Sequence, residues 1–544
     1  MSYKANETQQ VGLNDRFNNL TEKEKKIVLG SWAKPFAEII FPSIREDEFA
    51  VLYSNNKATR PNTPINIVVG AMIIKEIVGM TDAEVLESLS CDIRMQYALH
   101  TTSYVEQPMS DRTFSRFRQR LYEYELENGE DLMKEELLYQ ADRIAKFMEV
   151  QPYLKRMDSL MIASACKDIT RLEVIYVTVA NLVNAAHRAG VDELIQGMEH
   201  YLKPDDQNRE IYHNQAEDRI KKTQAMVEDC ATLLERLGEA GSELPEYALA
   251  ERMLNDQSVI GDDGKRIAKN SHDIKPNSMQ NPSDPEATYR KKAGKSHKGY
   301  VANIVQTYNE KGAAVITDYS FQQNSYSDVD FGKEAIENIA ETVREDDPKK
   351  TELIGDGGFA SEENSALAKT NGISFITTSL TGTKPPEILA DYVINKEEHR
   401  IEQCPMGNEP ESQTWNPLKD TYRVVMEKEQ CVNCPNRAEC KAQITKHHAF
   451  VTISATRVEH AKVVKEIASE AYTQYRNSRN AIEGLPSVLR RRYHVDDIPV
   501  FGLLKSKLRF GFKIAAINVK NLLKYTRDHC ACQNATFVPR EQCL

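Results

Sequence analysis

Three residues near the C-terminal end of the chain combine side chains that bind metal ions and phosphate. Arg479 and Glu483 are four residues apart, so in a helix both side chains lie on one face. Arg490 follows Glu483 by seven residues, or two helical turns, and projects from nearly the same face. A carboxylate between two arginines suits a site that holds both a divalent cation and a phosphate group. The alternative is a solvated helix with an ordinary ion pair, and partners for Glu483 elsewhere in the chain would decide between the two.

Two aspartates lie where strand propensity alone would not place a carboxylate. Asp158 is inside a strand predicted over 153–162, where an unpaired carboxylate is unfavourable. Asp356 ends a short apolar strand, and the two glycines after it allow a tight turn and the close approach of another group. Two aspartates and a glutamate can hold two Mg²⁺ or Mn²⁺ ions about 4 Å apart, which activate a water or a 3′-hydroxyl against a phosphodiester. We therefore predict that Asp158, Asp356 and Glu483 form a metal-binding trio.

The segments around these carboxylates alternate between strand and helix patterns, which is typical of an α/β fold. The predicted strands span 153–162, 300–308, 313–321, 351–356 and 373–379, and the predicted helices span 328–343 and 361–369. The sequence thus predicts a mixed sheet flanked by helices, with two aspartates on strands and the glutamate on a later helix.

The N-terminal part of the chain is predicted to be helical. Capping boxes begin helices at Thr21 and Thr81. A later helix over 114–121 has an apolar stripe that leaves Arg112 and Arg116 facing outward. Short helices ending in a basic one fit a helix-turn-helix-like DNA-binding unit. A helical dimerisation or scaffold domain with a solvated basic face is the alternative.

Charge is distributed unevenly along a chain whose net charge is −11. Residues 475–527 contain twelve Lys and Arg against three Asp and Glu, whereas residues 191–256 contain seven against sixteen. This asymmetry predicts one face for a polyanion and another kept away from it. The residues of the basic stretch predicted to contact phosphate are Arg479, Arg490, Arg491, Arg492, Lys505 and Lys507. For Lys505 and Lys507 the alternative is the exposed face of an edge strand, because they alternate with apolar residues.

Four cysteines have the spacing of a structural zinc site. Cys431 and Cys434 form a CxxC pair, with Cys404 before it and Cys440 after it. Such a set fits four-thiolate zinc coordination, and free thiols in a reducing compartment are the alternative. The ten cysteines among 544 residues do not form a disulfide framework, and no secretory or membrane-spanning signal is apparent, so a cytoplasmic location is expected.

In these motifs the chain resembles bacterial insertion-sequence transposases of the Asp-Asp-Glu (DDE) class with an InsH-like N-terminal domain. The resembling segments are 60–121 in the helical part, 157–159 (Met-Asp-Ser), 297–300 (His-Lys-Gly-Tyr), 356–359 (Asp-Gly-Gly-Phe), 479–483 (Arg-Asn-Ala-Ile-Glu) and 515–522 near the C-terminus. The family's Tyr-Arg-Glu-Lys signature is altered, because Arg476 stands at the tyrosine position, with Tyr475 one residue earlier, and Arg490 stands at the lysine position. Arginine binds phosphate bidentately where lysine acts as a point charge.

The resemblance implies a ribonuclease H-like catalytic core and a DNA transposase that binds terminal inverted repeats, cleaves DNA strands and transfers them to a target. Asp158, Asp356 and Glu483 would be catalytic and would hold two Mg²⁺ or Mn²⁺ ions. The implied partners are the double-stranded DNA of the element ends and of the target, bound by a homodimer in the bacterial cytoplasm at the nucleoid, with no membrane. A ribonuclease H-like DNA nuclease without strand transfer and a catalytically silent, transposase-derived DNA-binding regulator are the alternatives.

The expected domains follow from these assignments. They are a helical DNA-binding or dimerisation domain (1–145), a discontinuous ribonuclease H-like core (150–170, 296–385 and 462–526), an acidic helical insertion (171–295), a β-rich Cys-containing insertion (386–461) and a C-terminal tail (527–544).

Overall fold

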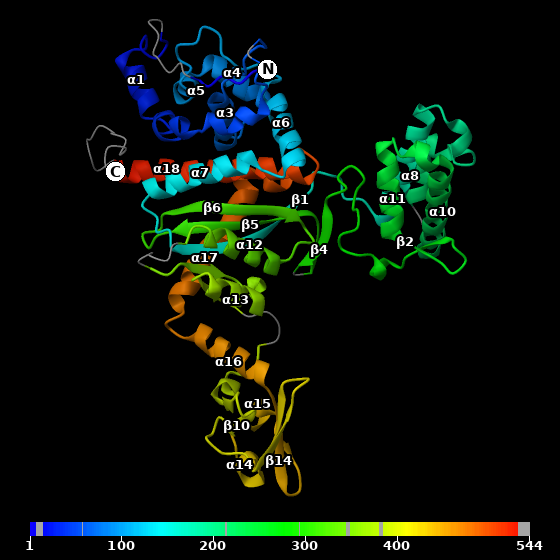
Figure 1. The fold of residues 1–544 in the computed structure, drawn as a ribbon, viewed down its shortest axis with the longest axis vertical. Coiled ribbons are helices and arrows are strands. Elements are labelled where there is room, and N and C mark those ends of the chain that lie inside the picture. The colour runs from blue at the N-terminus through cyan, green and yellow to red at the C-terminus, as the bar shows by residue number, and fades with distance from the viewer. Residues whose placement is uncertain are drawn as a thin grey trace. The chain divides into compact units, whose positions relative to one another are not determined.

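The chain divides into two compact units (Figure 1). The computed structural model describes residues 1–6, 15–56, 58–212, 215–292, 294–343, 349–379 and 384–530. Unit 1 comprises Met1–Val150, Ser159–Tyr326 and Pro486–Leu544, and unit 2 comprises Gln151–Asp158 and Ser327–Leu485. The expected C-terminal tail lies outside the described residues from position 531 onward. In the part of the chain that the structure describes, no helix is long and apolar enough to cross a membrane.

Helices make up the N-terminal part of unit 1. They are α1 (Glu22–Leu29), α2 (Ala33–Pro35), α3 (Ile65–Val78), α4 (Asp82–Cys91), α5 (Ile93–Ala98), α6 (Thr113–Asn128) and α7 (Leu132–Phe147), with short η turns at Phe36–Ile40, Phe41–Ser43 and Glu46–Leu52. The capping boxes predicted at Thr21 and Thr81 begin α1 and α4. In α6, Phe114, Phe117 and Leu121 are buried as the apolar stripe predicts, because residues three and four apart share one helix face.

One mixed sheet contains the predicted strands. Its strands are β1 (Leu154–Ala163), β4 (Thr288–Lys292), β5 (Lys295–Tyr308), β6 (Ala314–Gln323), β7 (Glu352–Gly355) and β8 (Ser374–Thr377). The order is β4-β5-β1-β7-β8, and β6 pairs with β5. The β5–β6 pair is the antiparallel hairpin expected from the sequence, whereas β7 pairs in parallel with both β1 and β8. A mixed sheet with helices is therefore confirmed.

The last helix of unit 1, α18 (Leu503–Cys530), lies against β6, α7 and α3 (Figure 1). Asn518 accepts a hydrogen bond from the Ile316 amide and donates one to the Ile316 carbonyl, both at 2.8 Å, and Asn521 donates to the Ala314 carbonyl at 3.1 Å. These two side chains hydrogen-bond to backbone groups of β6 that are not paired with β5. The free edge of β6 is thereby protected from pairing with another strand. Lys505 and Lys507 lie in this helix, so the edge-strand alternative for them is wrong. The apolar residues beside them satisfy the 3.6-residue period of a helix as well as the alternation of a strand.

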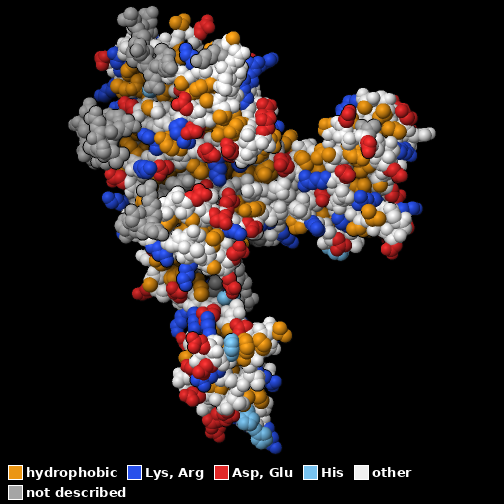
Figure 2. Space-filling view, in the orientation of Figure 1, with side chains coloured by type: hydrophobic (Ala, Val, Ile, Leu, Met, Phe, Trp, Pro, Cys, Tyr) orange, Lys and Arg blue, Asp and Glu red, His pale blue; other side chains and the backbone are white. Residues whose placement is uncertain are grey.

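The segment expected as an acidic helical insertion is largely helical within unit 1. Its elements are α8 (Arg171–Arg188), η4 (Asp192–Ile195), η5 (Glu199–Leu202), α9 (Asp206–Ile211), α10 (Ala216–Gly241), α11 (Pro245–Gln257), β2 (Ser258–Ile260), β3 (Arg266–Ala268) and η6 (Ser271–Asp273). Its buried residues, among them Leu182, Val227 and Leu233, form a separate hydrophobic core. On the face drawn in Figure 2, the lobe of α8, α10 and α11 carries Asp and Glu interspersed with Lys and Arg.

Unit 2 contains the first part of β1, the whole of β7 and β8, and a second, smaller sheet. Its other elements are α12 (Asp328–Ala340), η7 (Gly357–Phe359), α13 (Glu362–Thr370), η8 (Glu387–Asp391), β9 (Val393–Asn395), β10 (Arg400–Gln403), β11 (Ser412–Asn416), β12 (Thr421–Glu427), α14 (Lys428–Val432), α15 (Arg437–Cys440), β13 (Gln443–Ile444), β14 (His448–Ser454) and α16 (Ala455–Ala468). Strands β11, β12, β14 and β13 form the smaller sheet, whose core includes Tyr422, Val424 and Val451. Helix α17 (Thr473–Tyr493) begins in unit 2 and contains Pro486, where unit 1 resumes.

Candidate active site

The parallel pairing of β1 with β7 sets Asp158 and Asp356 at the same level of the sheet. The register pairs Leu154 with Glu352 and Arg156 with Ile354. Asp158 lies two residues after Arg156 in β1, and Asp356 lies two residues after Ile354, directly past the end of β7. In extended backbone a step of two keeps each side chain on the face of its paired predecessor. Two carboxylates far apart in sequence thus lie side by side within unit 2.

The turn after β7 fixes the carboxylate of Asp356. Its Oδ1 accepts a hydrogen bond from the Gly358 amide at 2.8 Å, while the Gly357 amide donates to Ser379 Oγ at 3.0 Å. A Cβ atom at position 358 would lie 3.0 Å from Oδ1 of Asp356 and 3.3 Å from Oδ2 of Asp328. Glycine at 358 therefore lets the backbone approach the carboxylates closely, which the glycine pair had indicated.

Helix α17 is tied to β1 through a buried arginine. Arg156, which precedes Asp158 by two residues, donates from Nη1 to the carbonyl oxygen of Ser478 at 2.9 Å. Ser478 immediately precedes Arg479, so this hydrogen bond holds that turn of α17 beside the strand that carries Asp158. Tyr475 lies one turn earlier and hydrogen-bonds to Glu352 at the start of β7, where burial raises the pKa of the Glu352 carboxyl and the hydrogen bond opposes the rise.

All three predicted carboxylates converge on the guanidinium of Arg479. Nη2 of Arg479 donates to Oδ1 of Asp158 at 3.2 Å and lies 3.7 Å from Oδ2 of Asp356. Nη1 lies 3.3 Å from Oε1 of Glu483, the i, i+4 partner that the sequence predicted. The side chains of Asp158 and Arg479 are 14% and 9% exposed, against 36% for Asp356 and 58% for Glu483, so the group opens to solvent on the side of the last two.

Arg479 has hydrogen-bonding capacity left over. Its Nε and Nη1 atoms are buried and make no hydrogen bond, although Nη1 is close to Glu483. Buried donors without a partner are unfavourable and are usually satisfied by water or a ligand. A phosphate oxygen would meet this need, because guanidinium donors form strong charge-assisted hydrogen bonds to phosphate.

The positive charge of Arg479 lies among the carboxylates, where a bound metal ion would also have to lie. Across the described residues, no group of three or more His, Cys, Asp or Glu side chains is arranged to hold a metal ion as it stands. The donor set of Asp158, Asp356 and Glu483 still fits Mg²⁺ or Mn²⁺, which prefer carboxylate oxygens and keep other positions for water and phosphate. Ion binding would require Arg479 to withdraw from the centre of the group.

The residues predicted to contact DNA phosphates have different surroundings. Arg112, Arg116, Arg491, Arg492 and Lys505 are exposed. Arg490 pairs with Asp496 at 3.1 Å and donates to the Met161 carbonyl at 2.8 Å. Lys507 is largely buried between Glu125 and Asp131, with its Nζ 2.8 Å from Oδ2 of Asp131. Their roles as DNA contacts stay predictions.

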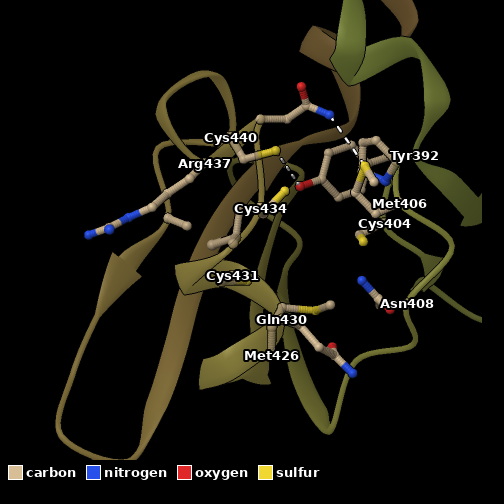
Figure 3. A pocket seen from close by; sticks show the side chains of 14 residues that line it. Tyr392, Cys404, Met406, Asn408, Met426, Gln430, Cys431, Cys434, Arg437 and Cys440 are labelled. Atoms are coloured by element: carbon tan, nitrogen blue, oxygen red, sulfur yellow. Dashed lines mark hydrogen bonds between the residues drawn. The ribbon is translucent and has the colours of Figure 1, made fainter.

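The four cysteines of the predicted zinc site line one small cavity of about 30 Å³ (Figure 3). Burial raises the pKa of the Cys431 thiol, and the three other cysteines of the set add to the rise because neighbouring thiolates would repel one another. Tyr392 donates a hydrogen bond to Sγ of Cys440 at 3.4 Å. Cys404, Cys431, Cys434 and Cys440 are free thiols in this structure.

Two residues near the carboxylates were not assigned a role from the sequence. Arg156 lies in the predicted strand, and a charged residue two positions before Asp158 on the same strand face was the signal that could have identified it. Asp328, the first residue of α12, has its carboxylate beside Gly358 and thus next to Asp356. Asp328 follows the capping residue Ser327, and an acidic residue in the first turn of a helix is favourable on its own. The sequence pattern therefore gave no reason to assign Asp328 to a site.

Two family models match the chain. One, described as Transposase DDE domain, matches residues 403–523, and the other, described as Transposase domain (DUF772), matches residues 24–120. No match was found among curated proteins or solved structures. The chain thus carries two domains of transposases, one near each end. Together they identify it as an insertion-sequence DDE transposase.

The DDE family match covers only part of the carboxylate group. Residues 403–523 include Arg479, Glu483 and the four cysteines of the cavity, whereas Asp158 and Asp356 lie outside it. The convergence of these two aspartates on Arg479 is therefore evidence independent of the family match.

Proposed function

We propose that this transposase cleaves DNA strands at the ends of its element and joins the freed 3′ ends to a target, using Asp158, Asp356 and Glu483 as the catalytic carboxylates. The observation that carries the proposal is the contact of all three side chains with the guanidinium of Arg479. They come from positions up to 325 residues apart in sequence, and mutually repelling carboxylates gather where a cation is to be bound.

The residues around the trio have separable roles in this proposal. Two Mg²⁺ or Mn²⁺ ions bound by the carboxylates would activate the attacking water or 3′-hydroxyl and stabilise the leaving oxygen. Arg479 keeps the carboxylates together before a metal ion binds and turns its remaining hydrogen-bond donors to a DNA phosphate when DNA enters. Gly358 holds Asp356 through its amide, and Arg156 holds α17 at Ser478.

The strand order supports a ribonuclease H-like core. With β4 set aside, the order is β6-β5-β1-β7-β8, so the first strand is central. Strands β5 and β6 form an antiparallel pair, β7 pairs in parallel with β1, and β8 pairs in parallel with β7. Asp158 is on the central strand and Asp356 directly follows its parallel neighbour, the arrangement we expect for such a core.

DNA contacts and assembly complete the proposal. The exposed Arg491, Arg492 and Lys505 near the end of α17 and the start of α18 would bind backbone phosphates, and Arg112 and Arg116 would do so in the helical N-terminal part. Joining two element ends requires two active sites, so a homodimer on DNA is expected. The four cysteines have no part in the chemistry.

The test uses DNA that carries both flanks of the coding sequence, with Mg²⁺ or Mn²⁺ and a supercoiled target plasmid. We expect nicks at a defined position in each flank, 3′-hydroxyl products joined to the target, and loss of both reactions in Asp356→Asn. Glu362→Gln, an exposed carboxylate on α13, is the matched control and should remain active.

Two other outcomes would replace the proposal. Defined nicks without any joined product would indicate the nuclease alternative. Specific binding of the flanks without nicking, unchanged by Asp356→Asn, would indicate the regulatory alternative.

A further inference from the structure

The strongest feature outside the carboxylate group is the four-cysteine cavity. Its cysteines come from three separate segments: the turn after β10, the helix α14 with the residues that follow it, and the end of α15. A cavity of about 30 Å³ has room for about one water molecule or a single ion. Figure 3 shows the cysteines grouped around it, with Cys440 beside the Tyr392 hydroxyl.

The backbone around each cysteine is bent into a tight turn. The amide of Cys404 donates to the Asn408 carbonyl at 2.9 Å and the Gly407 amide donates to the Cys404 carbonyl at 2.8 Å, with Gly407 at a φ of +78° that favours glycine. In the CxxC segment the Cys434 amide donates to the Cys431 carbonyl at 3.4 Å. Such turns direct the cysteine side chains toward the same cavity.

Local helix formation does not explain why these turns are ordered. Helices α14 and α15 contain five and four residues, and such short helices are unstable without outside contacts. Neither has a side-chain cap, and none of the residues within them is buried. Their packing against the core of the smaller sheet is made by partly buried residues, among them Cys431 of α14 and Cys440 of α15. A metal ion bound by these cysteines would add a stronger restraint.

The lining of the cavity selects one type of ligand. Besides the cysteines it has apolar side chains such as Val451 and Met426 and amides such as Asn408, and no carboxylate or histidine is among the described residues that line it. Arg437 also lines it, but its guanidinium points away from the sulfurs in Figure 3. Four sulfur donors with no carboxylate or histidine beside them favour zinc or an iron–sulfur centre, with tetrahedral geometry.

A second layer of contacts is already present. The hydroxyl of Tyr392, a residue only 4% exposed, donates to Sγ of Cys440. A hydrogen bond to a ligand sulfur orients it and stabilises the thiolate form that a metal requires. Phenylalanine would fill the same space in an apolar core. The hydroxyl of Tyr392 is therefore explained by its hydrogen bond to Cys440 and not by packing.

We propose that Cys404, Cys431, Cys434 and Cys440 bind one Zn²⁺ as four thiolates and that this ion fixes the segment from β10 to β13 in unit 2. The sulfurs would move from their places around the cavity to about 2.3 Å from the ion, each thiol releasing its proton. The site is structural, because four protein ligands leave no open position for a substrate. This proposal does not depend on the catalytic one.

The test begins with the full chain purified under reducing conditions. We expect about one zinc per chain by elemental analysis. After removal by a chelator, Co²⁺ should restore one site with the thiolate-to-metal charge-transfer and visible bands of tetrahedral four-sulfur coordination. Cys434→Ser should weaken Co²⁺ binding at least tenfold, and Cys91→Ser, an exposed cysteine elsewhere in the chain, should leave it unchanged.

A measurement that does not need a folded variant keeps the proposal open to refutation. In the wild-type chain, zinc should slow alkylation of these four thiols, read residue by residue by mass spectrometry, and leave Cys91 as reactive as before. A fully reduced chain that binds neither Zn²⁺ nor Co²⁺, or one isolated with iron and sulfide at these cysteines, overturns the proposal. Strand cleavage is a separate readout, so either proposal can fail without the other.

Discussion

The carboxylate group and the four-cysteine cavity of unit 2 are both proposed metal-binding sets, and they differ in what lies among them. The carboxylates surround the guanidinium of Arg479, whereas the cysteines surround a small cavity. The reason is the ionisation of each ligand type. Aspartate and glutamate are charged at neutral pH and must be compensated at all times, but thiols stay neutral until a metal displaces their protons.

This difference predicts how the activity and the fold at each proposed site would respond to loss of a metal ion. A group compensated by an arginine can be assembled before any ion arrives, so loss of the ion should remove activity and leave the fold intact. A cavity lined by neutral thiols has no internal substitute for the ion, so loss of the ion should loosen the short helices around it.

Replacing Glu483 by glutamine should separate activity from stability. We expect strand cleavage to fall by roughly three orders of magnitude, since one charged ligand of the reacting centre is lost. Glu483 is the exposed partner of its i, i+4 pair with Arg479, and such a pair contributes only about 0.5 kcal/mol, so thermal unfolding should hardly change. Cleavage rates and melting curves measured on the same preparation check both parts. A large drop in melting temperature with the loss of activity would make Glu483 a structural residue.

Replacing Arg479 by glutamine should make the DNA-free protein bind Mn²⁺ more tightly. Removing a positive charge about 4 Å from a divalent ion is worth up to about 8 kcal/mol at an effective dielectric constant of about 20, and we expect roughly 10²-fold in affinity after solvent screening and relaxation. Electron paramagnetic resonance of free Mn²⁺ measures this directly. Arg479→Lys keeps the charge and is the control, with affinity near that of the wild type. Unchanged or weaker Mn²⁺ binding in the glutamine variant would mean that Arg479 only positions the carboxylates.

Adding a methyl group at Gly358 should displace Asp356. The new Cβ would lie 3.0 Å from Oδ1, closer than ordinary van der Waals contact, so the carboxylate must shift by a few tenths of an ångström. We expect the cleavage rate to fall between tenfold and a hundredfold, because catalytic groups tolerate little misplacement. Gly484→Ala is the control, since no atom lies within 4 Å of the added Cβ there. Equal rates in the two variants would show that the contact at Gly358 does not set the position of Asp356.

Replacing Tyr392 by phenylalanine should weaken zinc binding about tenfold, because the hydrogen bond to Cys440 is lost while the ring is kept. Competition between the protein and a chromophoric chelator measures the affinity. Tyr422→Phe is the matched control, a buried tyrosine of the same core that does not line the cavity. The same affinity in both variants would remove Tyr392 from the proposed site.

Much of the fold could be predicted from local patterns. The capping boxes at Thr21 and Thr81, the strand at Asp158 and the hairpin before α12 follow from spacing within a few residues, and the structure agrees with them. Lys505 and Lys507 were harder to assign, because a short stretch of alternating residues satisfies a strand and a helix alike. The packing of α18 on β6 decides that stretch for the helix.

For the candidate site, the sequence determined which side-chain types are present and the tertiary structure determined their arrangement. The types of Asp158, Asp356, Arg479 and Glu483, and the i, i+4 spacing of the last two, indicated a metal and phosphate site without any coordinates. That Arg479 lies among all three carboxylates depends on the parallel register of β1 with β7 and on the hydrogen bond from Arg156 to Ser478. Such long-range contacts leave no local pattern in the sequence, because they depend on how distant segments pack. The ligand types are therefore encoded locally, whereas the cation at their centre is a property of the folded chain.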